Sequence, residues 1–343
     1  MGRCLLVQVV ALALWGTACS QTADSPVPAS ETRPPGSLGR VGSPDDAVTE
    51  PLAGAVLLMG GGPDVDSALA WWLGQARGGD VVVLRATGST GYNDYLLGLA
   101  PVNSVETFRV NTRELAQDSA LNRALRKAEA VFLAGGDQWD YIRLWGGTAL
   151  EATLRSLIAH KRIAIGGTSA GCAVLGQFVF TAQNGSVTSA EALANAYHPN
   201  VTLQNQFLQV PGLENVATDQ HYTQRDRHGR HLVFLGRMLA STDTARGIGV
   251  DEATAVCLPP YGQAWVVGAG KAYFLEATAA TGPETFGAGQ PITWHRGGQA
   301  LRVYRLGQTP GGGFWLTDWQ TASGGTWGWW SVQDGTLTEA YGN

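Results

Sequence analysis

Short apolar runs alternate with longer amphipathic segments along the chain from residue 51 onward. Runs such as DVVVLRA (80–86) and AVFLAGG (130–136) are rich in β-branched residues and reach a turn or a glycine pair, which predicts buried strands. The segment TALEATLRSLIAH (148–160) has helical spacing, and Thr148 and Glu151 have the spacing of a capping box. Because strands that alternate with helices require right-handed crossovers, the pattern predicts an α/β fold with a mostly parallel sheet.

The pattern changes beyond about residue 280. The segments ALRVYRL (300–306) and TWGWWSVQDGTLTEAY (326–341) alternate aromatic and polar residues between glycine-rich turns, as antiparallel hairpins do. We therefore predict a β-rich extension over 281–343 that packs on a main domain over 51–280. Its tryptophans are expected to fill this packing interface, and binding of a polymer or sugar is the alternative.

The N-terminus has the features of a targeting segment. Arg3 precedes the apolar run Leu5–Trp15, and small residues lead into Cys19. This predicts a signal peptide over 1–19 of the bacterial lipoprotein type, with Cys19 lipidated, and cleavage near Ala18 for ordinary secretion is the alternative. Residues 20–50 are rich in proline, serine and glycine and are predicted to be a disordered linker. The mature protein is expected outside the cytoplasm, in the cell envelope, the periplasm or the medium.

Composition and cysteine usage exclude several classes of function. The net charge of −5 gives no reason to expect nucleic acid or an anionic membrane surface as a partner, apart from a lipid anchor. Only Cys172 and Cys257 lie outside the signal segment, which predicts two buried thiols rather than a disulfide framework or a metal site. The glycine turn GGGPDVDS (60–67) lacks the third glycine of a dinucleotide site and the lysine of a phosphate loop. We expect no metal and no cofactor.

The stretch IAIGGTSAGCAVLG (163–176) contains the pattern Gly-x-Ser-x-Gly between a buried strand and a small-residue helix. A serine at such a corner has a strained backbone, and side chains two positions away on either side would collide with it. Its hydroxyl then projects above a helix N-terminus, where the next backbone N–H can stabilise an oxyanion. Ser169 is therefore a candidate nucleophile, and a plain strand-to-helix turn is the alternative.

His221 is the strongest candidate for a base among the six histidines. It follows the expected strand NVATD (215–219), so it should lie at the same sheet edge as Ser169. Asp251 and Glu252 offer an acid after a further strand, although the pair could instead cap a helix. The resulting order of serine, histidine and acid differs from that of α/β-hydrolases and argues against an esterase or lipase.

Four ordered motifs resemble the serine peptidases typified by cyanophycinase and dipeptidase E, whose fold is similar to that of class I glutamine amidotransferases. The motifs are FLAGGDQ (132–138), GGTSAG (166–171), TDQHYTQRDRHGR (218–230) and GIGVDEATA (247–255). The resemblance implies a three-layer flavodoxin-like domain and a peptide substrate. In cyanophycinase, that substrate is cyanophycin, a polyaspartate backbone that carries arginine on its side chains, and the products are β-Asp-Arg dipeptides. A homodimer is left open.

The resemblance also implies a role for each matching residue. Ser169 would be the nucleophile, His221 the base and Glu252 the acid, with Asp251 as the fallback. The predicted oxyanion-hole and substrate-binding residues are, respectively, Gly136 and Ala170, and Gln138, Asp219, Gln220, Arg225, Arg227 and Arg230. Two alternatives remain open: a non-catalytic module that binds acidic peptides, and an amidotransferase-like enzyme that uses Cys172. The arginines could also form an ordinary solvated helix start.

Overall fold

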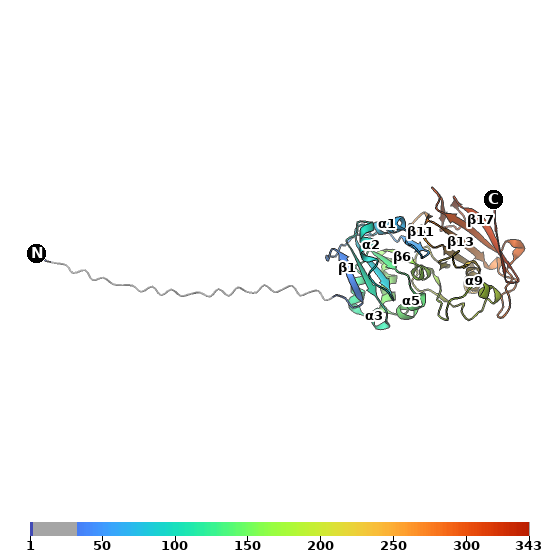
Figure 1. The fold of residues 1–343 in the computed structure, drawn as a ribbon, viewed down its shortest axis with the longest axis horizontal. Coiled ribbons are helices and arrows are strands. Elements are labelled where there is room, and N and C mark those ends of the chain that lie inside the picture. Colours follow the sequence, from blue (N-terminus) through green and yellow to red (C-terminus); the bar gives the residue numbers. More distant parts are fainter. Residues whose placement is uncertain (3–32, 343) are drawn as a thin grey trace. The chain divides into compact units, whose positions relative to one another are not determined.

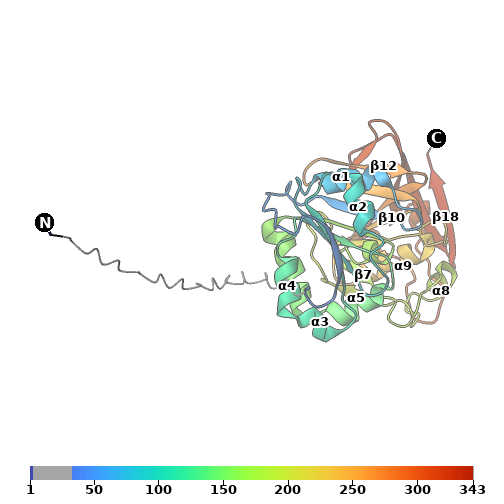
Figure 2. The same ribbon diagram turned by 60° about the vertical axis from the view of Figure 1, so that its left-hand side comes forward.

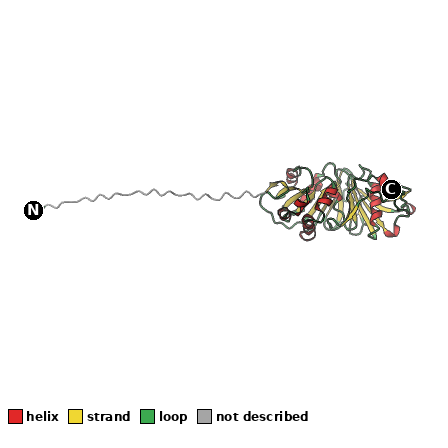
Figure 3. Cartoon of the chain, turned by 90° about the horizontal axis from the view of Figure 1, so that it is seen from below, coloured by secondary structure: helices red, strands yellow, loops and turns green. Residues whose placement is uncertain are grey.

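The computed structural model describes residues 1–2 and 33–342. Arg33–Asn343 forms one compact unit in which helices flank the strands (Figure 3). Its first sheet has ten strands in the order β1-β4-β3-β5-β6-β2-β11-β12-β15-β16. These strands are β1 (Ser37–Gly42), β2 (Val56–Met59), β3 (Asp80–Arg85), β4 (Ser104–Arg109), β5 (Ala130–Leu133), β6 (Ala164–Thr168), β11 (Thr254–Leu258), β12 (Gln263–Gly268), β15 (Gly313–Trp315) and β16 (Ala322–Ser323).

The centre of this sheet is parallel. β4, β3, β5, β6 and β2 pair in parallel, whereas β1 and the strands beyond β2 pair in an antiparallel manner. Since parallel neighbours must be joined by crossovers, helices cover both faces of this region. The predicted α/β fold with a mostly parallel central sheet is therefore confirmed.

Side-chain alternation along the strands builds two cores. Val81 and Val83 of β3 face one core with α1 and α2, while Val82 and Leu84 face the other with α3 to α6. Figures 1 and 2 show α1 and α2 together, away from α3 and α5. The helices are α1 (Asp66–Gly74), α2 (Asn93–Leu99), α3 (Arg113–Gln117), α4 (Ser119–Leu125), α5 (Gln138–Trp145), α6 (Ala149–Ser156), α7 (Ala170–Ala173), α8 (Ser189–Ala194) and α9 (His228–Met238).

The second sheet has eight strands in the order β18-β17-β14-β13-β10-β9-β7-β8. They are β7 (Phe178–Phe180), β8 (Leu203–Asn205), β9 (Val216–Asp219), β10 (Thr244–Val250), β13 (Lys271–Thr278), β14 (Leu301–Gly307), β17 (Thr326–Gln333) and β18 (Thr336–Tyr341). β7, β9 and β10 pair in parallel, and the other pairs are antiparallel. One face shares the core that contains α3 to α6, and the other packs against α8 and α9.

The C-terminal strands extend both sheets rather than forming a sheet of their own. β14, β17 and β18 continue the second sheet from β13, and β15 and β16 continue the first sheet from β12. β1 and β17 accordingly lie at opposite ends of the compact unit (Figure 1). Trp294, Trp319 and Trp330 are buried, in line with the packing role expected for tryptophans of this region. The predicted domain boundary at 280/281 stays a prediction.

The linker predicted over 20–50 is wrong for part of its length, because Ser37–Gly42 forms β1. β1 pairs with β4 from Ser37 to Gly42, and Arg40 forms an ion pair with Asp80. These partners lie tens of residues away along the chain, so tertiary pairing overrides the local composition. The predicted signal peptide and Cys19 lie outside the described residues. Within the described part of the chain, no helix has the length and apolarity that crossing a membrane requires.

Helix capping also differs from the sequence prediction. Thr148 does precede α6, but its hydroxyl donates to the carbonyl of Trp145 and caps no helical N–H. A complete capping box is found instead at Thr188 and Glu191, at the start of α8. The spacing of two residues therefore allows a capping box without specifying one.

Candidate functional site

Ser169 lies at the sharp corner between β6 and α7. Its backbone has φ +52° and ψ −118°, in a region that residues other than glycine rarely adopt. The corner is fixed to the neighbouring strand, because the Ser169 N–H donates to the carbonyl of Met59 on β2 at 3.1 Å. The side chain is half-buried, so the hydroxyl is held in place and is still reachable.

The glycines around Ser169 are required by close backbone contacts. A Cβ on Gly167 would lie 2.5 Å from the carbonyl carbon of Gly171, and one on Gly171 would overlap the carbonyl of Leu133 in β5. On the next loop, a Cβ on Gly135 would contact the Ser169 side chain at 3.5 Å. The corner therefore packs so tightly that only glycine fits at these positions.

His221 meets Ser169 from the second sheet. It follows β9, and its Nε2 lies 2.8 Å from Ser169 Oγ, within hydrogen-bonding distance. His221 also has a left-handed backbone, with φ +47°, and its N–H donates to the carbonyl of Gly60 at 2.7 Å. Two strained residues thus face each other where β6 of the first sheet and β9 of the second sheet end, and such strain is typical of functional sites.

Glu252 completes the line on the far side of the imidazole. Its Oε1 forms a hydrogen bond with His221 Nδ1, and its own N–H donates to the side-chain oxygen of Gln224 at 2.9 Å. Asp251 is engaged elsewhere, since its carboxylate accepts the N–H groups of Thr223 and Lys271, each at 2.9 Å. Of the two acids considered from the sequence, Glu252 contacts the histidine and Asp251 fixes the backbone beneath it.

The loop 60–62 packs against the side chains of His221 and Glu252. The sequence analysis did not predict this role of the loop. A Cβ on Gly61 would lie 2.5 Å from the His221 ring, and one on Gly62 would lie 3.1 Å from the Glu252 side chain. Both glycines have positive φ, +89° and +71°. The glycine run was visible in the sequence, but its contact with His221 comes only from the pairing of distant strands.

Burial sets the protonation state of His221. The side chain is almost fully buried, and desolvation lowers its pKa below the ordinary value, helped by the positive charges of Arg225 and Arg227. The hydrogen bond that His221 Nδ1 donates to Glu252 opposes this effect without overcoming it. The imidazole is therefore neutral near pH 7 and able to accept a proton from Ser169.

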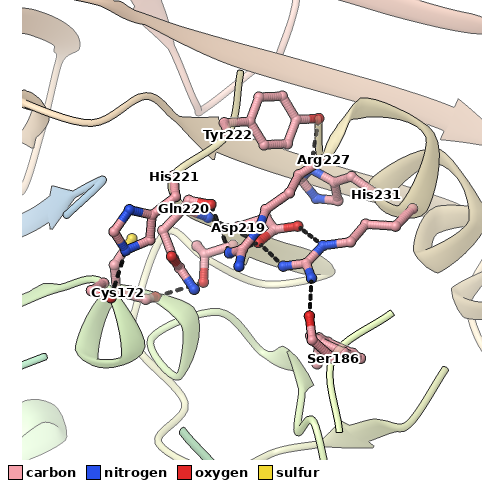
Figure 4. Close-up of polar contacts among 12 residues, drawn as sticks. Cys172, Ser186, Asp219, Gln220, His221, Tyr222, Arg227 and His231 are labelled. Atoms are coloured by element: carbon pink, nitrogen blue, oxygen red, sulfur yellow. Dashed lines mark hydrogen bonds and ion pairs between the residues drawn. The ribbon is translucent and has the colours of Figure 1, made fainter. Parts of the chain in front are cut away.

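Asp219 and two arginines form a buried cluster beside the histidine. Arg230 binds both carboxylate oxygens of Asp219, at 2.8 and 2.6 Å, and Arg227 approaches one of them at 3.3 Å. Burial opposes ionisation of Asp219, but the two guanidinium groups outweigh it and lower its pKa to about 2. Figure 4 shows Asp219 at the centre of this cluster, with Gln220 and His221 on one side and His231 on the other.

Arg227 and Arg230, whose substrate-binding role stays a prediction, belong to this cluster. Both side chains are buried, at 7% and 1% exposure, and they neutralise Asp219 instead of facing a cleft. Arg230 is buried because a loop distant in the sequence packs over it, where the Ser186 hydroxyl and the carbonyl of Val187 accept hydrogen bonds from its guanidinium group. Arg225, in contrast, is exposed.

The remaining predicted residues lie near the same edge. Gln220 is buried, and its side-chain oxygen has no hydrogen-bond partner among the described residues. Gln138 begins α5, and its side-chain nitrogen donates to Phe180 at 3.4 Å. Gly136 is exposed in the loop after β5, and Ala170 is the first residue of α7, directly after the serine.

Cys172 lies under the corner and is inaccessible. It is fully buried, and desolvation raises the pKa of its thiol far above the ordinary value. Thr218 donates a hydrogen bond to its carbonyl at 2.7 Å, which fixes the start of α7 to β9. Cys257 is also buried. Neither thiol has the electropositive, accessible surroundings of a nucleophile.

Comparison with known proteins adds family evidence to this geometry. Residues 97–259, which contain all four sequence motifs, match peptidase family S51. The chain is 28% identical over 204 residues to a cyanophycinase from Trichormus variabilis, which is 59% of this chain and 62% of that protein. It is 30% identical over 175 residues to a cyanophycinase from Synechococcus elongatus, or 51% of this chain and 50% of that protein.

A solved peptidase from an acI-B1 Actinobacterium overlaps 76% of this chain and 97% of its own, with a TM-score of 0.49 and 16% identity. The matched segment spans less than two thirds of the length of the Trichormus protein. The resemblance expected from the motifs is nevertheless confirmed by the match to the family. Residues 97–259 therefore match peptidase family S51, and the chain is similar to cyanophycinases over 51–59% of its length.

Proposed function

We propose that the protein is a serine peptidase that uses Ser169, His221 and Glu252 as a catalytic triad. The observation that carries this proposal is the 2.8 Å contact between Ser169 Oγ and His221 Nε2 at a strained, accessible corner. The line continues through His221 Nδ1 to Glu252 Oε1. A triad is recognised by a nucleophile, a base and an orienting acid that lie in a line in space, and the order of these residues along the chain does not matter.

Each residue has one chemical task in the proposed reaction. Ser169 Oγ attacks the peptide carbonyl carbon while His221 Nε2 takes its proton, and the tetrahedral intermediate then expels the amine, which receives that proton. Water, activated by the same imidazole, hydrolyses the acyl-enzyme. Glu252 holds the Nδ1–H tautomer and stabilises the imidazolium. The backbone N–H groups of Gly136 and Ala170 are proposed to bind the oxyanion.

The proposed substrates are Asp-containing peptides or cyanophycin, which would be cleaved to β-Asp-Arg dipeptides. The similarity to cyanophycinases supports this class. One feature of the site fits it: Arg225 is exposed and can pair with a carboxylate. Gln138 and Gly136 border the same edge. Arg227 and Arg230 would act indirectly, by holding Asp219 and Gln220 in place.

We also propose that the enzyme is exported. The basis is the apolar run Leu5–Trp15 and the small residues before Cys19, which suit a lipoprotein signal or ordinary secretion. An exported enzyme would act on polymer released by other cells or on other acidic peptides. Mass spectrometry of the mature N-terminus tests this proposal, since lipidation at Cys19 and cleavage near Ala18 give different masses.

The decisive experiment compares Ser169→Ala with Cys172→Ser. We expect Ser169→Ala to lower turnover of cyanophycin or β-aspartyl peptides by at least about 10³-fold while substrate still binds. Cys172→Ser should retain activity, because the thiol is buried. A fluorophosphonate probe should label the protein only when Ser169 is present. Binding without turnover or labelling in the unmodified protein would favour a non-catalytic module, and loss of activity in Cys172→Ser alone would favour a cysteine mechanism.

A further inference from the structure

A pocket opens at the carboxyl ends of β3 and β4, at the edge of the first sheet where β6 also ends. It has a volume of about 260 Å³ and lies outside the residues that the triad and its neighbours account for. Its polar lining residues are Thr87, Arg109, Asn111, Asp140 and Arg143. The carboxyl edge of a parallel sheet is where ligands of α/β proteins bind.

The pocket is joined to the nucleophile by the loop after β5. A Cβ on Gly135 would lie 3.5 Å from the Ser169 side chain, and a Cβ on the next residue, Gly136, would lie 3.6 Å from Thr87 Oγ1. Arg109 lies further off: β6, β5, β3 and β4 are consecutive neighbours about 4.8 Å apart, so the end of β4 is about 14 Å across the sheet from the end of β6. An extended peptide covers that distance in about four residues.

The pocket contains one arginine that the fold leaves without a partner. Arg143 pairs with Asp140 through two contacts of 2.6 and 2.9 Å, and Arg85 binds the carbonyls of its own loop. Arg109, the last residue of β4, is exposed and forms no side-chain hydrogen bond or ion pair with any other residue in 33–342. The positive charge of Arg109 is therefore available to a ligand. The fork of a guanidinium matches the geometry of a carboxylate.

We infer that the Arg109 pocket is a subsite for a carboxylate of the bound peptide, located about four residues from the bond that Ser169 attacks. This inference rests on the proposed function only for the location of that bond. Arg109 would bind the carboxylate, and Asn111 would add an amide donor from the same wall. The subsite would therefore favour acidic over amidated residues at one position of the substrate.

The experiment measures binding separately from hydrolysis. In the Ser169→Ala background, calorimetry compares an acetylated, amidated tetra-aspartate with a series in which each Asp is replaced singly by Asn. We expect one position of the series to bind about tenfold more weakly, because a charge-assisted hydrogen bond is lost there. Adding Arg109→Gln should remove the difference at that position. Arg126→Gln is the matched control, since Arg126 is exposed in the turn between α4 and β5.

The outcomes separate the two proposals. The subsite is supported if Arg109→Gln, but not Arg126→Gln, abolishes the difference in affinity between the Asp and Asn peptides at one position. This holds even if the protein with Ser169 intact hydrolyses nothing. An equal weakening at every position would mean a general charge effect and would overturn the inference. An unchanged series, or no binding of any peptide in the Ser169→Ala background, would overturn it as well.

Discussion

Replacing Gly61 with alanine should impair the triad without altering any of its members. The new Cβ would lie 2.5 Å from the His221 ring, whereas comfortable contacts between carbon atoms need about 3.5 Å. The imidazole must therefore move by about 1 Å. The contact between Ser169 Oγ and His221 Nε2, at 2.8 Å, would then fall outside hydrogen-bonding distance or become misaligned. A displacement of this size costs about 10²-fold in kcat.

Gly54→Ala provides the matched control for this change. Gly54 also has a positive φ, +78°, but a Cβ there would meet nothing within 4 Å. Both variants should lose about 1–2 kcal/mol of folding free energy through left-handed strain, measured by chemical denaturation. Only Gly61→Ala should lose hydrolysis and fluorophosphonate labelling of Ser169. Full activity in Gly61→Ala, or an equal loss in both variants, would refute the assignment of the loop as a support for His221.

Two further predictions concern charge. Because burial lowers the pKa of His221, kcat/KM should reach half its plateau below pH 6.5, where the imidazole loses its proton. Arg225→Gln removes a positive charge that lowers this pKa, so the midpoint of its pH profile should move to a higher pH. A shift downward would contradict the assignment of His221 as the base. Asp219→Asn should destabilise the protein by about 3–5 kcal/mol in thermal or urea unfolding, since it leaves Arg227 and Arg230 buried without a counter-charge. Unchanged unfolding would show that these arginines find water or another anion.

The local features of the fold were predictable because they are encoded over a few residues. The strand and glycine pattern around Ser169 specifies a corner whose tight packing admits only glycine at Gly167 and Gly171. The sequence placed Ser169 and His221 at one sheet edge, which is wrong: β6 belongs to the first sheet and β9 and β10 to the second, and the three residues meet because these strands end close together. Sequence reasoning left Asp251 as a fallback, and the hydrogen bonds of its carboxylate to backbone N–H groups decide between the two acids.

The features that were missed depend on contacts between distant segments. Arg227 and Arg230 lie in a charged run that looks solvent-exposed, and only the fold shows that Asp219 and the 186–187 loop enclose them. β1 has linker composition and becomes a strand because the edge of β4 is free to pair with it. The division of the strands between two sheets, with C-terminal strands in both, likewise cannot be deduced from periodicity within one segment.

The members of the candidate triad do not all belong to one sheet. Ser169 ends a strand of the ten-stranded sheet, whereas His221 follows a strand of the eight-stranded sheet. Glu252 lies in the short turn through which the chain passes from β10 in one sheet to β11 in the other. Catalysis by the triad therefore depends on the correct packing of the two sheets against each other. If the two sheets move apart, His221 can no longer reach Ser169, and activity should be lost even while each sheet stays folded. Activity would then be a measure of complete folding.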